Sequence, residues 1–150
     1  MSLAGQNIDR ALLLVEDNPR DADLILRSLK KNHLLNPVVT VHDGEEALDY
    51  VFARGAYAGR QALPQVVFLD LKLPKLDGQE VLRAIRADER TKYLPVVILT
   101  SSDDELDLVR SLVGGANSYV RKPVVFAEFS EAVRQLGLYW LILNEAPQSA

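Results

Sequence analysis

The 150-residue sequence contains no cysteine, so neither a disulfide framework nor a thiolate metal site can form. Its two histidines, His33 and His42, lack the spacing of a metal site, and we expect both at the surface. No apolar run approaches the roughly 18 residues of a membrane span, and the first ten residues lack the apolar core of a signal peptide. These absences predict a cytoplasmic protein without disulfides or a membrane anchor.

Basic runs are also missing, and the formal net charge is -4. This charge disfavours nucleic acid as the main partner, and no DNA-binding module is recognisable in the sequence. What is present is an ordinary globular composition, with 48% hydrophobic and 25% charged residues and no repeat or low-complexity segment. The sequence therefore predicts a single domain.

Apolar segments alternate with helix signals along the chain. The expected strands are Ala11 to Val15, Pro37 to Val41, Val66 to Asp70, Val96 to Thr100 and Ser118 to Arg121. The expected helix starts are Asn18-Pro19, Asp43-Gly44, Asp77-Gly78, Ser102-Asp103 and the region of Phe126. Strict alternation of strands and helices predicts an α/β fold with a doubly wound parallel sheet. A longer connection, Gly55 to Pro64, precedes the third strand.

Polar side chains stand where four of these strands end. Asp70 closes the apolar third strand, Glu16 and Asp17 follow the first, Thr100 closes the fourth, and Lys122 follows the fifth. Taken singly, the acidic pair and the threonine are more typical of helix caps or turns than of a functional site. Together they predict a functional site, because ligands of open α/β sheets bind beyond the carboxyl ends of the strands.

The chemistry of this set indicates phosphoryl transfer. Three crowded carboxylates repel one another unless a cation joins them, and Mg²⁺ prefers such oxygen ligands. A carboxylate can act as a nucleophile toward phosphorus, and Asp70 on the central strand is the best placed. Lys122 would neutralise the phosphoryl oxygens, and the Thr100 hydroxyl would donate a hydrogen bond to them.

Five short segments resemble the receiver domain of two-component response regulators. They are Leu14 to Asn18, Phe68 to Pro74, Asp77-Gly78, Leu99 to Ser101 and Lys122-Pro123. The resemblance spans about 11–137, which makes 1–150 a single receiver domain with an apolar C-terminal extension at 138–150. It implies a flavodoxin-like (βα)5 sheet with the strand order 2-1-3-4-5.

The resemblance also implies roles for individual residues. Asp70 is the expected acceptor of a phosphoryl group from a sensor histidine kinase. Glu16, Asp17, Asp70 and the backbone carbonyl of Lys72 are the expected Mg²⁺ ligands. The Lys72 side chain is further expected to alter the lifetime of the phosphoryl group. Such a protein is not an enzyme beyond catalysing its own phosphorylation and dephosphorylation.

Two further roles follow from the same resemblance. Thr100 and Lys122 are expected to bind the phosphoryl oxygens, and the Lys122-Pro123 peptide bond is expected to be cis. Thr100 and Tyr119 would form the switch, with the aromatic ring turning inward on activation. Packing of Tyr119 against the fourth helix is an equally good interpretation from the residues alone.

The apolar segment from Leu136 to Leu143 admits two interpretations. It can extend the last helix over its own domain, or it can expose a patch for a partner. The tail is similar to that of small response regulators associated with bacterial phytochromes, which implies a phytochrome kinase as partner. It also implies a homodimer through the last strand and the last two helices, around Asp103 to Leu112 and Phe126 to Leu143. The alternative function is a phosphate sink or an intermediate receiver of a phosphorelay.

Three other classes are weaker. A phosphohydrolase of the haloacid dehalogenase type wants a second aspartate two residues after the nucleophile, where this sequence has Lys72. A flavodoxin-like cofactor binder is disfavoured because the first turn, Glu16 to Pro19, has two negative charges and no glycine. A receiver used only as a scaffold is disfavoured because every chemical position is filled.

Overall fold

The computed structural model describes residues 10–60, 62–101, 115–122 and 124–145, with side chains given to residue 135. Its strands are β1 (Leu12–Val15), β2 (Val38–Val41), β3 (Val66–Asp70), β4 (Val96–Thr100) and β5 (Ser118–Arg121). Its helices are α2 (Pro19–Lys31), α3 (Gly44–Val51), α4 (Gly78–Ala87) and α6 (Phe126–Glu145), with a short 3-10 helix η1 (Gly55–Tyr57). The first two strands each begin one residue later than predicted.

The five strands form one parallel sheet in the order β2-β1-β3-β4-β5, as predicted. β3 is central, and its register pairs Phe68 with Leu14 of β1 on one side and with Val97 of β4 on the other. Because all strands run the same way, their carboxyl ends meet at one edge. This order places the residues after β1, β3 and β4 side by side.

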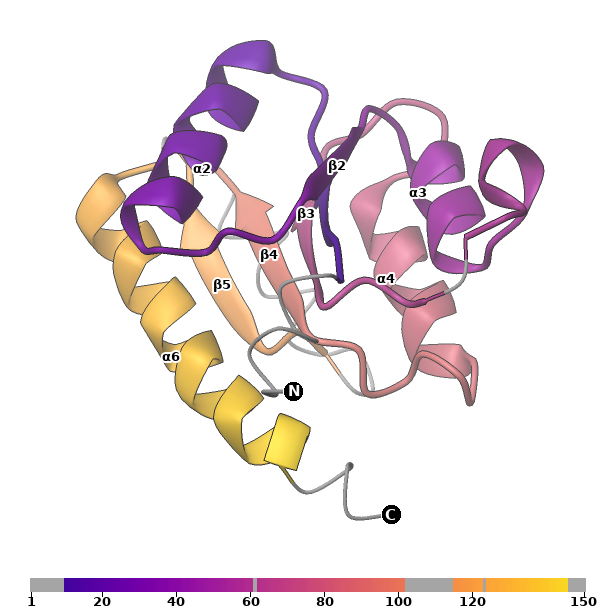
Figure 1. The fold of residues 1–150 in the computed structure, drawn as a ribbon. Helices are drawn as coiled ribbons and strands as arrows, with labels where there is room; N and C mark the ends of the chain where they lie inside the picture. The colour runs from indigo at the N-terminus through magenta and orange to yellow at the C-terminus, as the bar shows by residue number, and fades with distance from the viewer. Residues whose placement is uncertain (1–9, 61, 102–114, 123, 146–150) are drawn as a thin grey trace.

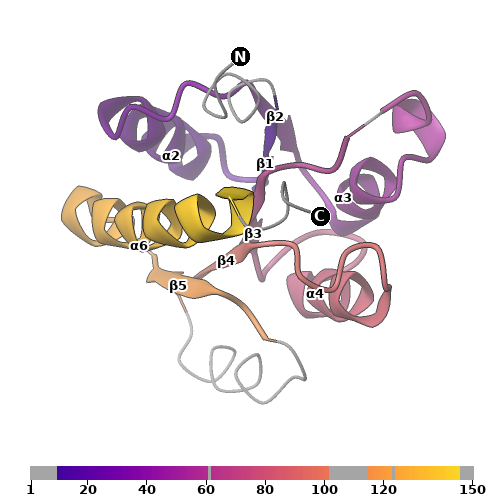
Figure 2. The same ribbon diagram turned by 60° about the horizontal axis from the view of Figure 1, so that its bottom comes forward.

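Helices cover both faces of the sheet. Figures 1 and 2 show α2 and α6 on one face and α3 and α4 on the other. Side chains alternate accordingly along β1: Leu13 and Val15 join the core under α3 and α4, whereas Leu12 and Leu14 join the core under α2 and α6. Burial on both faces explains why the central strands are continuous apolar runs.

The predicted caps start three helices. The Asn18 side chain accepts hydrogen bonds from the backbone N–H groups of Arg20 and Asp21. The side chains of Asp43 and Asp77 each accept from the N–H three residues on, at 2.8 and 3.0 Å. Glu46 departs by one residue from the capping-box pattern. Its Oε1 accepts from the N–H of His42, the residue before the cap Asp43.

The predicted connection before β3 is ordered around η1. Arg60 donates to the backbone carbonyls of Tyr50 and Val51 at the end of α3, and the Tyr57 hydroxyl donates to Glu46 at 2.9 Å. The segment is thereby held against α3.

The last helix continues unbroken through Gly137 to Glu145, so residues 138–145 extend it. The predicted fourth helix at Ser102 to Gly114 and the Lys122-Pro123 bond lie outside the described residues, as do the side chains of the tail. No helix in the described part of the chain is long and apolar enough to cross a membrane.

Candidate metal centre

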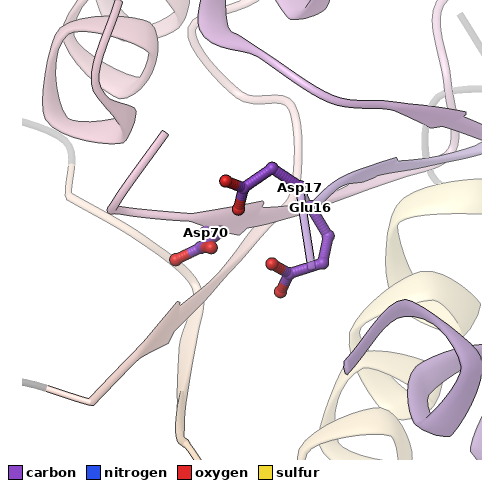
Figure 3. A group of neighbouring side chains, drawn as sticks. All are labelled: Glu16, Asp17 and Asp70. Carbon is purple, nitrogen blue, oxygen red and sulfur yellow. The ribbon is translucent and has the colours of Figure 1, made fainter. Parts of the chain in front are cut away.

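Three carboxylates meet at the carboxyl edge of the sheet. Glu16 and Asp17 follow β1, and Asp70 ends the adjacent strand β3. One carboxylate oxygen from each of the three lies within 4.8 Å of the others. Figure 3 shows the three side chains converging from the two strand ends. The proximity predicted from neighbouring parallel strands is confirmed.

The cluster is mostly buried. Glu16 is 1% exposed and Asp70 is 4% exposed, whereas Asp17 is open to solvent. Burial, and after it the neighbouring Asp70, raise the pKa of Glu16 to about 7 against the opposing effect of Lys122. Glu16 Oε2 accepts from the N–H of Asn18 at 3.2 Å, but within the described chain no hydrogen-bond donor with good geometry reaches Oε1.

A divalent cation suits this donor set. Carboxylate oxygens are hard ligands, and one exposed and two buried groups leave the site open on one side for water or substrate. The Oε1 atom of Glu16 is buried, and among the described residues it has an ion pair with Lys122 but no hydrogen bond. Added positive charge at the cluster would offset the burial and the nearby Asp70, which together raise the pKa of Glu16.

Lys122 brings an ammonium group into the cluster from the fifth strand. Its backbone N–H donates to the carbonyl of Thr100 at 2.8 Å, which fixes the residue beside β4. Its Nζ lies 2.7 Å from Glu16 Oε1, 3.0 Å from Asp70 Oδ2 and 3.1 Å from Asp21 Oδ2. Burial lowers the pKa of Lys122, but the close contact with Glu16 and the charge of Asp70 outweigh it and raise the pKa overall. The group therefore stays charged at neutral pH.

The other predicted residues surround this core. Thr100 is buried at the end of β4, and the N–H of Lys72, an exposed residue, donates to Asp70 Oδ1 at 3.1 Å. Tyr119 is half-buried in β5 and packs against the core under α3 and α4. The structure thus brings the predicted acids, threonine and lysine to one edge.

Gly78 packs closely against the backbone of Asp70. Its N–H donates to the carbonyl of Leu71 at 3.0 Å, and a Cβ atom on it would lie 2.3 Å from the Asp70 carbonyl oxygen. Only glycine permits this approach of α4 to the end of β3. Gly78 therefore serves the site as well as the start of the helix.

Two contacts were missed in the sequence. Asp21, in the first turn of α2, pairs with Lys122, and the only available signal was an acidic residue shortly after the Glu16-Asp17 turn. His42 is exposed, as is His33, which confirms the surface prediction. The His42 ring nevertheless reaches the site, with Nδ1 at 3.2 Å from the Glu16 carbonyl oxygen.

Comparison with known proteins identifies the family. The model of the response regulator receiver domain matches residues 12–134. The "Probable methanogenesis regulatory protein FilR2" of Methanothrix harundinacea is 41% identical over 139 residues, covering 93% of this chain and 88% of that protein. Among solved structures, the bacteriophytochrome response regulator AtBRR is 51% identical with a TM-score of 0.78, covering 88% of this chain and 95% of that chain.

A third relative is the response regulator Rcp1 of Synechocystis sp., 33% identical over 135 residues, with 90% of this chain and 91% of that protein covered. The solved structure of its Mn²⁺-bound form has a TM-score of 0.72, with 32% identity and coverage of 88% and 94%. These matches agree with the strand order and the acidic cluster described above. The chain belongs to the response regulator receiver domain family and is related to phytochrome response regulators.

Proposed function

We propose that this protein accepts a phosphoryl group on Asp70 from a phosphohistidine of a sensor histidine kinase. The observation that carries the proposal is the surroundings of Asp70: a buried carboxylate 3.0 Å from the Lys122 ammonium and within metal-ligand reach of Glu16 and Asp17. The Lys122 ammonium offsets part of the negative charge around Asp70, and a bound divalent cation would offset more, so the carboxylate could meet an anionic donor.

In this step an Asp70 carboxylate oxygen forms a bond to phosphorus. The bond between phosphorus and the donor nitrogen breaks, and its electron pair returns to the imidazole, which takes up a proton. Lys122 stays protonated throughout and neutralises the phosphoryl oxygens, and the buried Thr100 hydroxyl donates to one of them. The product is an acyl phosphate on Asp70.

The residues fit a divalent cation, and we assign its binding to Glu16, Asp17, Asp70 and the backbone carbonyl of Lys72. Bound Mg²⁺ supplies positive charge that stabilises the transferring phosphoryl group. The Mn²⁺-bound form of Rcp1 supports a divalent ion in this family. Lys72 itself is exposed beside Asp70, so Lys72→Ala should change the lifetime of the acyl phosphate while leaving its formation intact.

The proposed donor is a bacterial phytochrome kinase, because AtBRR is a bacteriophytochrome response regulator of 51% identity. Transfer from a purified, radiolabelled phytochrome kinase should be faster than from an unrelated sensor kinase at equal concentration. Equal rates would remove the phytochrome assignment but would leave phosphoryl acceptance itself in place.

The proposed output is a protein contact, in which the Thr100 hydroxyl and the Tyr119 ring shift on phosphorylation. We further propose a cytoplasmic homodimer of single receiver domains that joins through β5, the last two helices and the tail. Truncation after Gly137 should then halve the mass measured by light scattering, and an unchanged mass would exclude the tail as the contact.

The primary test is intact-protein mass after incubation with Mg²⁺ and acetyl phosphate. One phosphoryl mass should appear in the wild type and disappear in Asp70→Asn or with a chelator. Asp77→Asn is a matched control, since Asp77 is an exposed cap at the same edge whose carboxylate binds the N–H of Glu80. Absence of the added mass in the wild type would contradict the proposal.

The alternative role is a phosphate sink or an intermediate of a phosphorelay. It predicts that the phosphoryl group on Asp70 moves back to a kinase or on to a histidine phosphotransfer protein within the assay. Loss of label from this chain with its appearance on the second protein would favour the relay.

A further inference from the structure

Asp21 occupies a place in this site that the proposed phosphoryl chemistry does not require. It lies in the first turn of α2, and its Oδ2 is 3.1 Å from the Lys122 Nζ. Its side chain is 20% exposed, whereas those of Glu16 and Asp70 are at most 5% exposed. It is therefore the partner of Lys122 that water can reach most easily.

The start of α2 holds Asp21 in this position. The Asn18 side chain accepts from the N–H of Asp21 at 3.1 Å and from that of Arg20 at 2.9 Å, and Pro19 occupies the first helical turn. A capped first turn with a fixed proline loses little freedom when its side chains make contacts. The Asp21 carboxylate is thus positioned by the helix start, on a short side chain.

The Lys122 ammonium has three N–H donors and three carboxylate partners. The ammonium is therefore already paired with three carboxylates, at 2.7, 3.1 and 3.0 Å, before a phosphoryl group arrives. A phosphoryl oxygen can bind Lys122 only in competition with one of these carboxylates, and the Asp21 charge also repels an anionic donor. Both effects act in the same direction.

We propose that Asp21 is a positioning residue that restrains the Lys122 ammonium and slows phosphorylation of Asp70. The inference rests on the proposed function of Asp70. When the phosphoryl group arrives, Lys122 exchanges its bond to Asp21 for one to a phosphoryl oxygen, and Asp21 turns to solvent. No covalent bond changes at Asp21, which acts only through Lys122.

The test compares phosphorylation rates with acetyl phosphate at saturating Mg²⁺, followed by intact mass. Asp21→Asn removes the charge at constant shape, and its rate should exceed that of the wild type by about twofold to fivefold. Asp21→Glu keeps the charge and should restore the slow rate. Asp23→Asn is the control, because Asp23 lies in the same helix but pairs with exposed Arg27 instead of Lys122.

Three results would overturn the proposal: an Asp21→Asn rate equal to or below the wild-type rate, an equal gain in Asp21→Glu, or an equal gain in Asp23→Asn. A second measurement needs no phosphorylation. In metal-free protein, Asp21→Asn should lower the urea midpoint when Lys122 is present but not in the Lys122→Met background, where the carboxylate has lost its partner. Equal shifts in both backgrounds would also overturn the proposal.

The experiments distinguish a failure of the proposed function from a failure of the proposed role of Asp21. A wild type that takes no phosphoryl group refutes the proposed function, and the stability comparison still decides whether Asp21 holds Lys122. A wild type that is phosphorylated, with an unaffected Asp21→Asn variant, refutes only the restraint by Asp21.

Discussion

Without a metal, Glu16 should destabilise the folded protein as the pH rises. Its carboxyl group has an ordinary pKa of 4.5, and burial beside Asp70 raises that pKa to about 7. Between these two values the folded protein holds a proton that the unfolded chain has released. The free energy of unfolding therefore falls as the pH rises from about 4.5 to 7. Each pKa unit corresponds to about 1.36 kcal/mol, so the full effect is about 3 kcal/mol.

Glu16→Gln removes this effect while keeping the shape of the side chain. With a chelator present, the variant should match the wild type below about pH 4.5 and exceed its stability by up to about 3 kcal/mol above pH 7. Part of this gain is lost because the amide pairs less strongly with the Lys122 ammonium, 2.7 Å from Glu16 Oε1. The net difference above pH 7 should still be positive.

Urea unfolding followed by circular dichroism at several pH values between 4 and 8 measures this difference. Glu45→Gln serves as the control, because Glu45 is exposed on α3 and its substitution should give no comparable trend. Added Mg²⁺ should raise the midpoint of the wild type at pH 8 far more than that of Glu16→Gln, since the variant lacks one ligand. A stability difference that stays constant across the pH range would refute the reasoning.

Two further predictions concern the frame that holds the site. Gly78→Ala should lower the free energy of unfolding in urea by about 2–4 kcal/mol, because the new Cβ would meet the Asp70 carbonyl oxygen. Gly59→Ala should have little effect in the same titration, because the space around Gly59 is open. Phe129→Ala should cost about 3–5 kcal/mol, since this ring is fully buried on α6, whereas Phe126→Ala, 47% exposed, should cost much less by thermal unfolding. Comparable losses within either pair would contradict the packing described here.

Several features could be predicted from the sequence because they depend on interactions between nearby residues. Asn18, Asp43 and Asp77 cap their helices because short polar side chains reach backbone N–H groups of the next turn, a contact that depends on a few neighbouring residues. The apolar run before Asp70 predicted a strand buried on both faces, because such a strand is apolar at successive positions instead of alternating. The meeting of Glu16 with Asp70 followed from a general rule for parallel sheets once β1 and β3 were taken as neighbours.

The strand order itself came from the resemblance to receiver domains. Periodicity places apolar side chains on a face but does not say which strand lies next to which, because pairing is decided by packing across the whole sheet. The one-residue differences at the starts of β1 and β2 have a local cause, since strand ends depend on the last hydrogen bond to a neighbour.

The electrostatics of the site were decided by the tertiary structure alone. The contact between Asp21 and Lys122 joins the start of α2 to the end of β5, and no spacing in the sequence predicts it. The raised pKa of Glu16 likewise depends on how deeply the fold buries one carboxylate and how near it brings another. The sequence by itself determined which chemical groups stand at the strand ends. Distances, burial and the sharing of one ammonium among three carboxylates arise only when remote segments pack, because Coulomb energies and desolvation depend on separation in space.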